Sequence, residues 1–278
     1  MAKNIALSLR ILWKIVKFCF LTYAVVFSIA GTIGICYGYM TLTKPMRDVK
    51  YLIDHNPKET AFMTIYRSEL RAKGKPDTLT FHFISIDSIA KNLQNAVIAS
   101  EDDGFYTHPG IDIEAILKAA EYNREKNKMA RGASTITQQL AKNLFLDSEK
   151  NFLRKAKEFG YTMLLEKYLT KKRILELYLN YAQWGETVFG CEAASRLYYK
   201  KPCSHLSIQE ASRMAATLAM PSRVTPLNST SVFIQKRVEV IANNLYRRHM
   251  INDSGYTEVS GLAAPKDSIT DSMTTNGN

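Results

Sequence analysis

Residues 18–43 carry no charged side chain and consist mainly of aliphatic and aromatic residues. About 20 apolar residues in a helix suffice to cross the hydrocarbon core of a bilayer. A helix is also what such a segment forms in lipid, because its backbone polar groups are bonded internally. A cleavable signal peptide is the competing explanation, but this run is longer than a signal-peptide core and no small-x-small cleavage site ends it. The sequence therefore predicts a transmembrane helix over 18–40.

The flank before this segment, residues 1–17, predicts the orientation of the helix. Its charged side chains are Lys3, Arg10, Lys14 and Lys17, with no acidic residue among them. Short basic flanks stay in the cytoplasm. We therefore expect a cytoplasmic N-terminus, with everything after about residue 43 on the other side of the membrane.

The rest of the chain divides into a connector, a domain and a tail. Residues 41–80 are polar and contain several Pro and Gly breakers, which predicts a juxtamembrane connector. Residues 81–250 show apolar side chains at three- and four-residue spacing, typical of a mainly α domain. At their start, the alternation in LTFHFIS predicts a short strand with Phe81 and Phe83 on one side. Residues 251–278 are rich in Ser, Thr, Asn and Gly, which predicts a disordered tail.

The formal net charge of +11 favours an anionic partner. Nucleic acid, anionic lipid headgroups and a phosphorylated substrate all meet that description. We exclude nucleic acid, because it would need a cytoplasmic domain with a recognition element and neither is evident. Two cysteines, Cys191 and Cys203, lie outside the apolar segment, and both a disulfide and buried free thiols are open for them.

The stretch AVIASEDDGFYTHPG, residues 96–110, brings three acids and a histidine together after an apolar run. The acids are Glu101, Asp102 and Asp103, and the histidine is His108. A solvated loop, a metal site and a catalytic carboxylate are all compatible with this pattern.

The next stretch, RGASTITQQLAKNLFL at 131–146, predicts a helix with Ile136, Leu140 and Leu144 on one face. The opposite face carries Thr135, Gln138, Gln139 and Lys142. Such a row of amides, a hydroxyl and an ammonium suits a sugar phosphate, because each group donates hydrogen bonds without a change of protonation. A solvated helix face is the alternative.

In NFLRKAKEFGYTMLLEKYL, residues 151–169, we expect an apolar core face that turns Arg154 and Glu158 to the other side. The core face comprises Phe152, Ala156, Phe159 and Met163. Arg154 and Glu158 form either an ion pair worth about 0.2 to 0.5 kcal/mol or part of a cationic cluster that meets a diphosphate. Glu176 and Asn180 make a similar pair in KKRILELYLN.

These stretches resemble, in order, the motifs of the family 51 peptidoglycan glycosyltransferases, which polymerise lipid II. EDDGFYTHPGID carries the first motif, E-D-x-x-F-x-x-H-x-G-x-D, from Glu101 to Asp112. The other three are RGASTITQQLAKN at 131–143, RKAKE at 154–158 and KKRILELYLN at 171–180, and a weaker likeness continues through FGCEAASRLYYKKP and AMPSRVTP. QWGETVFG adds a likeness to the stand-alone biosynthetic members of the family. The resemblance implies a mainly α, lysozyme-like, two-lobed glycosyltransferase domain over 81–250.

The chain departs from the family pattern at three places. Leu218 stands where many relatives have proline, and Tyr199 with Lys200 replaces the frequent Phe-Gly. Lys150 stands where some relatives place an arginine, and lysine keeps the charge without the planar fork.

The resemblance implies an inverting displacement in which a sugar hydroxyl attacks the donor sugar and polyprenyl diphosphate leaves. Glu101 matches the general base, and Glu158 matches the family's second glutamate. By the same match His108 is expected to structure the loop, and Asp103, at a variable position, is expected to be solvated. The residues implied to bind sugar or diphosphate are Ser134, Thr135, Gln138, Gln139, Lys142, Asn143, Lys150, Arg154, Lys155 and Asn180. No cofactor is required and no metal ligands are specified, although a Mg or Mn ion at the diphosphate is compatible with the chemistry.

The family likeness also implies a setting, the bacterial inner membrane, with one membrane pass and a periplasmic catalytic domain. The expected partners are lipid II, the growing lipid-linked glycan, the membrane itself and other cell-wall synthesis proteins. An apolar lobe between the first two motifs, here with Ile116, Leu117 and Met129, is expected to dip into the bilayer. The S-x-x-K match at 88–91 lies upstream of the first motif and no K-T-G occurs, so we expect no transpeptidase domain.

Two rival functions remain open at this level. A lysozyme or lytic transglycosylase shares the broad fold and a catalytic glutamate, but it needs an acid for a sugar leaving group rather than cations for a diphosphate. A non-catalytic, membrane-anchored scaffold would keep the fold without activity. The basic cluster around Glu158 favours synthesis over cleavage, and the presence of both glutamates favours an enzyme over a scaffold.

Overall fold

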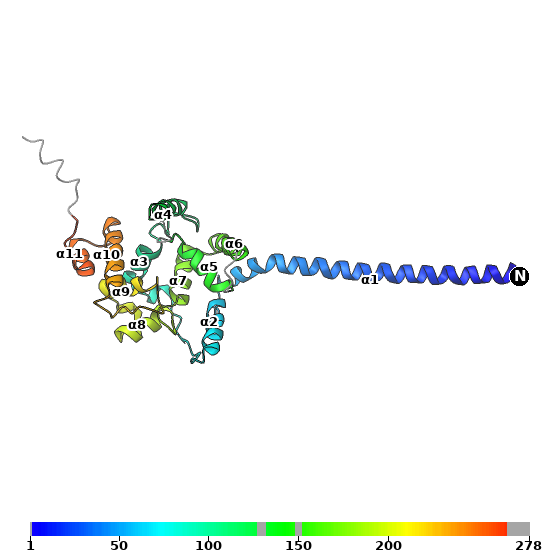
Figure 1. Ribbon diagram of the computed structural model, residues 1–278, viewed down its shortest axis with the longest axis horizontal. Helices are drawn as coiled ribbons and strands as arrows, with labels where there is room; N and C mark the ends of the chain where they lie inside the picture. Colours follow the sequence, from blue (N-terminus) through cyan, green and yellow to red (C-terminus); the bar gives the residue numbers. More distant parts are fainter. Residues whose placement is uncertain (1, 127–131, 148–151, 266–278) are drawn as a thin grey trace, which may run out of the picture. The chain divides into compact units, whose positions relative to one another are not determined.

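The computed structural model describes residues 2–126, 132–147 and 152–265 (Figure 1). It divides into two units, residues 1–51 and 52–278, which we describe separately. The first unit is one helix, α1 (Ala2–Tyr51), with Pro45 inside it. Its stretch Val16–Cys36 has a mean hydropathy of 2.0 and is long enough to cross a membrane. The predicted apolar helix is confirmed, and it continues to Tyr51 into the region expected to be a connector.

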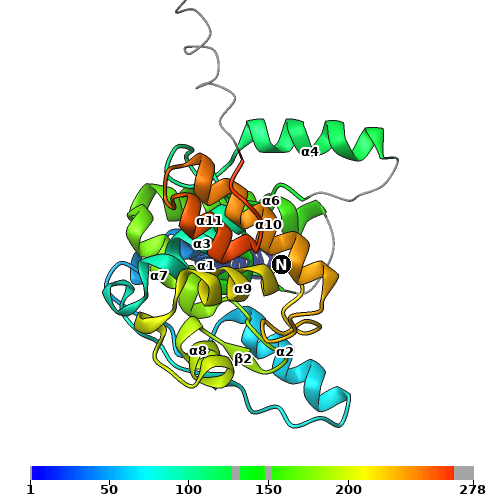
Figure 2. The same ribbon diagram turned by 90° about the vertical axis from the view of Figure 1, so that its left-hand side faces the viewer.

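The second unit is mainly α, as predicted. Its elements are α2 (Ala61–Ala72), β1 (Thr80–Phe81), η1 (Ile86–Ser88), α3 (Lys91–Glu101), α4 (Ile113–Glu125), α5 (Ile136–Phe145), α6 (Phe152–Tyr168), α7 (Lys171–Tyr181), β2 (Val188–Phe189), α8 (Cys191–Tyr199), η2 (Cys203–His205), α9 (Ile208–Thr217), α10 (Val232–Arg247) and α11 (Asp253–Ser260). The strands β1 and β2 pair in parallel, with Thr80 opposite Val188. In one group of helices α3 packs against α9 and α10, and in the other α5 packs against α2, α6 and α7. Figure 2 shows α4 standing apart from both groups at the edge of the domain.

The predicted strand forms where its apolar alternation placed it. Phe81 and Phe83 both contact Tyr181 of α7, with ring centroids 5.4 Å and 5.8 Å away. The two phenylalanines therefore share one side of the segment, and this face attaches it to the core.

The connector predicted over 41–80 is instead largely ordered. Thr60 caps α2 by accepting a hydrogen bond from the Met63 amide, and Met63 is buried. The segment before this cap is bonded to α7, because Arg173 donates to the Leu52 carbonyl and Tyr181 to the Pro57 carbonyl. The polar composition of the segment does not predict this structure, because the bonds come from side chains more than 100 residues later in the chain.

The face of α6 is opposite to the one we expected. Phe152 and Phe159 are 90% and 53% exposed, whereas Glu158 is only 4% exposed. The buried face of the helix is formed by Glu158, Thr162 and Leu165. Apolarity predicted the wrong face, because this helix buries the carboxylate of Glu158 and turns Phe152 and Phe159 outward.

The tail expected to be disordered from residue 251 contains the helix α11. Asn252 caps it by accepting from the Gly255 amide. Tyr256 and Val259 are buried, and the Tyr256 hydroxyl donates to Asn243 of α10. Two apolar residues at helical spacing were enough to dock this short helix, so the prediction is wrong for 253–260. Residues 266–278 lie outside the described part of the chain.

Lys200 ends α8 in the left-handed conformation, with φ of 58°. This is the position where the family frequently has glycine, and glycine adopts this conformation without strain. We expect Lys200→Gly to raise the free energy of unfolding by about 1 kcal/mol, because a non-glycine residue in this region is strained by that order. Urea unfolding of parent and variant measures the difference. If the urea midpoint of the variant is equal to or lower than that of the parent, the hydrogen bond from Lys200 Nζ to the Leu197 carbonyl compensates for the backbone strain.

Cys191 and Cys203 are both buried and free in this structure. Burial, followed by a hydrogen bond with Cys203, raises the pKa of the Cys191 thiol well above its ordinary value. Of the two alternatives left open by the sequence, the structure has the buried thiols.

Candidate active site

The first motif is folded by its own polar side chains. Asp102 accepts hydrogen bonds from the His108 ring at 2.7 Å and from the Ile136 amide, the first residue of α5, at 2.9 Å. The other ring nitrogen of His108 accepts from the Gly110 amide at 3.1 Å. Asp102 therefore ties the loop to the start of α5, and His108 is a structural residue, as its motif position suggested.

Three more residues of the motif hold the same loop. Phe105 is fully buried beneath the Lys171 ammonium, which lies 4.6 Å from the ring centroid and also donates to the His108 carbonyl. Gly110 has φ of 88°, and a Cβ there would lie 2.6 Å from the Glu166 side chain, so glycine is required. Asp112 caps α4 by accepting from the Ala115 amide.

The catalytic candidate Glu101 lies at the end of α3, with both carboxylate oxygens held. Oε1 accepts from Arg237 and from the Ser100 hydroxyl, each at 3.0 Å. Oε2 accepts from the Gln139 amide at 3.0 Å. Gln139 is itself oriented by Tyr178, whose hydroxyl donates to its oxygen at 3.1 Å. Burial raises the pKa of Tyr178 well above its ordinary value, so this hydroxyl remains a donor.

Helix α10 braces the segment around Glu101, and the sequence analysis missed it. Arg237 donates to the Ser100 carbonyl and hydroxyl as well as to Glu101. Seven residues further along, Asn244 donates to the Ala99 carbonyl at 2.7 Å. Both residues lie on one face of α10, since seven residues are nearly two helical turns. The available signal was a pair of polar residues at this spacing on one face of the helix.

Asp103 also belongs to this brace, whereas we had expected it to be solvated. It pairs with Arg247 at 2.9 Å and with Arg248 at 2.5 Å, at the end of α10. The three consecutive acids Glu101, Asp102 and Asp103 therefore have different partners, and of the three Glu101 is the one bonded to Arg237 and Gln139.

Two of the predicted binding residues in the second motif have structural roles. Thr135 and Gln138 form the capping box at the start of α5, and both side chains are buried. The Thr135 hydroxyl also donates to the Gly110 carbonyl at 2.6 Å. Both residues therefore help to hold the loop, and Thr135 also lines the cavity beside Glu101.

The remaining second-motif residues line two cavities, whose walls are connected by the hydrogen bond between Gln139 and Glu101. The Glu101 cavity, of about 510 Å³, is lined by Glu101, Ser134 and Arg237 among others. The Lys142 cavity, of about 230 Å³, is lined by Gln139, Lys142 and Asn143 together with Tyr178 and residues of the last motif. Because Gln139 bonds to Glu101 and also lines the Lys142 cavity, a ligand spanning the two would meet a carboxylate and a cation.

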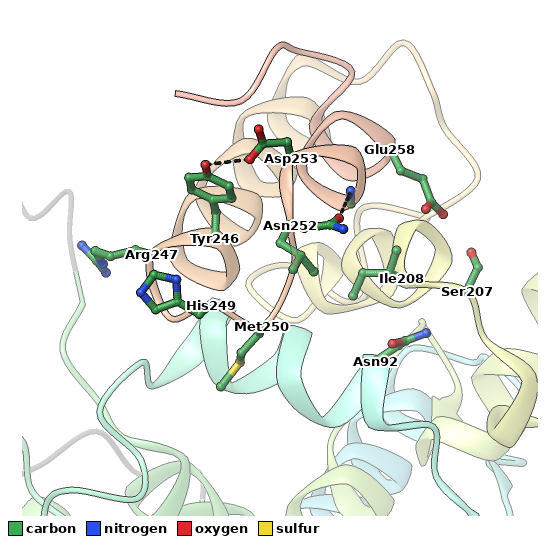
Figure 3. Close-up of a pocket in the computed structure, with 12 residues that line it drawn as sticks. Asn92, Ser207, Ile208, Tyr246, Arg247, His249, Met250, Asn252, Asp253 and Glu258 are labelled. Atoms are coloured by element: carbon green, nitrogen blue, oxygen red, sulfur yellow. Dashed lines mark hydrogen bonds between the residues drawn. The ribbon is translucent and has the colours of Figure 1, made fainter. Parts of the chain in front are cut away.

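A larger cavity, of about 1030 Å³, lies between the end of α10, α11 and the start of α9 (Figure 3). Tyr246, Arg247 and His249 are on its wall, and Tyr246 donates to Asp253. The lining residues described there include none from the four motifs. We therefore take the two smaller cavities as the candidate active site.

The third motif brings cations and a carboxylate close to Lys142. Glu158 is buried and pairs with Lys155. Partial removal of water by the cavity walls lowers the pKa of Lys142, although its side chain remains exposed, and the Glu158 charge opposes this effect. The charges of Arg154 and Lys155 lower it further, which places all of these groups within electrostatic reach of one another. Lys150, the remaining predicted cation, lies outside the described residues.

Asn180 does not reach the site. Its side chain is fully buried, accepting from the Ile84 amide and donating to the Ile84 and Glu176 carbonyls. Glu176 likewise accepts from the Ile86 amide. The fourth motif therefore holds the segment after β1 onto α7, and we remove Asn180 from the substrate-binding set.

One group of potential metal ligands occurs among the described residues, formed by Asp102, His108 and Asp112. Both nitrogens of His108 are occupied by hydrogen bonds, and both oxygens of Asp102 accept hydrogen bonds. A metal ion would have to replace bonds that fold the loop, so these residues do not fit a metal. Glu158 is a better candidate, because Mg²⁺ is often held by a single carboxylate together with substrate phosphates.

Comparison with known proteins agrees with the motifs. A family model described as Transglycosylase matches residues 70–246. A protein of Thiobacillus denitrificans named "Biosynthetic peptidoglycan transglycosylase" is 45% identical over 193 residues, covering 69% of this chain and 83% of its own length. Proteins with the same name from Ralstonia nicotianae and Cupriavidus metallidurans are 42% and 47% identical, covering 68% and 60% of this chain and 83% and 72% of their own lengths. The chain therefore belongs to the transglycosylase family, the family 51 glycosyltransferases that its four motifs resemble.

Proposed function

We propose that this protein polymerises lipid II into β-1,4-linked glycan strands and releases polyprenyl diphosphate. The observation that carries the proposal is the position of Glu101, held from one side by Arg237 and from the other by Gln139, next to a cavity with Lys142. Within the described part of the chain, Oε2 accepts a single hydrogen bond and so retains an open acceptor position. This oxygen is available to take a proton from a sugar hydroxyl.

The reaction then proceeds as one displacement. Glu101 Oε2 removes the proton of the acceptor's 4-hydroxyl. As it does so, the hydroxyl oxygen bonds to the anomeric carbon of the donor sugar, and the bond from that carbon to the diphosphate breaks. Negative charge grows on the leaving diphosphate, and positive side chains stabilise it without proton transfer. Lys142, Arg154 and Lys155 supply that charge, and buried Glu158 holds Lys155 in place.

A divalent ion at the diphosphate is compatible with this site. Glu158 would hold it, and the ion would supply additional positive charge at the leaving group. The residues described here already provide cations, so we expect activity to fall but not disappear when a chelator is added.

The exposed apolar side chains support a position at the membrane surface. α4 exposes Ile113 and Leu117, and α6 exposes Phe152 and Phe159. With the apolar helix α1 these side chains fit a protein that works on a lipid-linked substrate at the bilayer. We propose that the protein crosses the inner membrane once and has a periplasmic domain. There the domain has access to lipid II and to other cell-wall synthesis proteins. Protease accessibility in spheroplasts tests the orientation, and protection of the domain would contradict it.

The direct test is incubation of the detergent-solubilised full chain with labelled lipid II, with and without a chelator. We expect a polymer that a muramidase digests. A parallel sample with intact sacculi tests the lytic rival. Release of sacculus fragments without polymer formation would mean that the protein cleaves glycan, and activity in neither sample would favour a scaffold.

The pH dependence should report on Lys142. Since its pKa is lowered, chiefly by burial, the ammonium loses its proton at a lower pH than an ordinary lysine. Activity should therefore fall on the alkaline side below pH 10.5, the ordinary lysine pKa. Lys142→Arg keeps its charge to a pKa above about 12, so it should move this limb to higher pH. The measurement is the rate of polymerisation against pH, and an unmoved limb would assign it to another group.

A further inference from the structure

Phe62 lies on α2, upstream of the matched segment 70–246. Nevertheless, its side chain lines the Lys142 cavity. Two aromatic neighbours hold the ring, with centroids 6.0 Å away at Tyr66 and 5.9 Å away at Phe189. The segment that leads into α2 is bonded to α7, as described above. An aromatic ring from outside the four motifs is therefore fixed in the wall of the candidate site.

The wall of this cavity has a polar and an apolar part. Gln139, Lys142 and Asn143 contribute amides and an ammonium, whereas Phe62 and Pro221 contribute apolar surface. A pyranose ring has matching sides, because its hydroxyl and N-acetyl groups lie at the edge and its C–H groups form an apolar face. Ligand sites of this kind use apolar and aromatic walls for contact area and a few polar groups for orientation.

We propose that Phe62 is a specificity-determining residue that packs against the apolar face of an N-acetylated sugar ring of the lipid-linked substrate. Gln139, Lys142 and Asn143 bind the polar edge of the same ring. This inference rests on the proposed function and adds to it a role for the segment between α1 and the matched domain.

A flat ring also fits the position better than a flexible aliphatic chain. Phe62 is partly exposed, and its two aromatic neighbours limit its movement, so little conformational entropy is lost when a sugar packs on it. Contact with the sugar exists before and during the displacement alike. Phe62 should therefore contribute to binding of substrate and transition state equally, which affects KM and not kcat.

The test compares Phe62→Ala with the parent full chain in the lipid II polymerisation assay. We expect KM to rise about two- to tenfold, the range of a packed aromatic contact, with kcat within about twofold of the parent value. Phe62→Tyr keeps the ring and should retain the parental KM. Tyr66→Ala is the comparison variant: Tyr66 supports the Phe62 ring but is not among the residues that line the cavity, so KM should rise less than in Phe62→Ala.

A parental KM in Phe62→Ala, or an equal rise in Tyr66→Ala, would overturn the inference. If Phe62→Ala does not fold, Phe62→Leu replaces it, since leucine keeps apolar volume without a ring, and the same rise in KM is expected.

A second experiment varies a lipid-linked oligomer donor at fixed lipid II, and then lipid II at fixed donor. The series in which KM rises identifies the substrate whose sugar contacts Phe62, and no rise in KM in either series contradicts the contact. A parent chain that makes no polymer would refute the proposed function itself, whereas a polymerising parent with an unaffected Phe62→Ala refutes this inference alone.

Discussion

Glu101→Gln is expected to lower the rate of lipid II polymerisation by about 10²- to 10⁴-fold, the contribution of a positioned general base. Glutamine has nearly the same shape, so Arg237 and Gln139 still surround the side chain, but its amide cannot accept the proton of the sugar hydroxyl. The loss should appear in kcat, while KM for lipid II changes little. Initial rates of polymer formation at saturating and limiting lipid II separate the two.

Two controls make this result specific. Circular dichroism and thermal unfolding should show that Glu101→Gln folds like the parent. Asp103→Asn removes the neighbouring acid, whose carboxylate pairs with Arg247 and Arg248, and it should cost far less activity. A Glu101→Gln protein that polymerises at the parental rate would exclude this residue as the base.

Arg237→Gln is expected to lower kcat by roughly 10- to 100-fold, the worth of a hydrogen bond between charged groups. Arg237 touches no substrate atom in this proposal and acts by positioning Glu101 and the Ser100 backbone. Without it, Oε1 loses its cationic partner and the carboxylate is free to rotate away from the acceptor hydroxyl. The fall should lie in kcat rather than KM, because the orientation of the base matters at the displacement.

Lys236→Gln provides the matched control for Arg237→Gln. Lys236 is the preceding residue on α10 and is exposed. Its substitution removes the same charge from the same helix. Its rate should equal that of the parent. If both variants lose activity equally, the general positive charge of α10 is responsible and the positioning role is wrong. Arg237→Lys, which keeps a donor but has no planar fork, should recover part of the rate.

The fold class and the family could be predicted because each rests on local pattern. The helices of the domain follow apolar spacing, and part of the first motif is folded by bonds between residues close in sequence, such as Asp102 with His108 and Asp112 with the Ala115 amide. The role of His108 could be assigned for the same reason. By contrast, Thr135 and Gln138 were assigned to substrate from their polar helix face and Asn180 from its motif position, and in the structure their side chains bond to the backbone.

The sequence by itself determined that an uncharged helix precedes a mainly α domain, that four motifs stand in family order, and that Glu101 is the best candidate base. Only the tertiary structure decided which face of α6 is buried, that α2 forms part of the cavity wall, and that Arg237 holds Glu101 from 136 residues away. Periodicity shows that a helix has two faces, but the choice between them depends on what packs there. For Glu158 the neighbours are cations, and ion pairing with Lys155 offsets the cost of burying its charge.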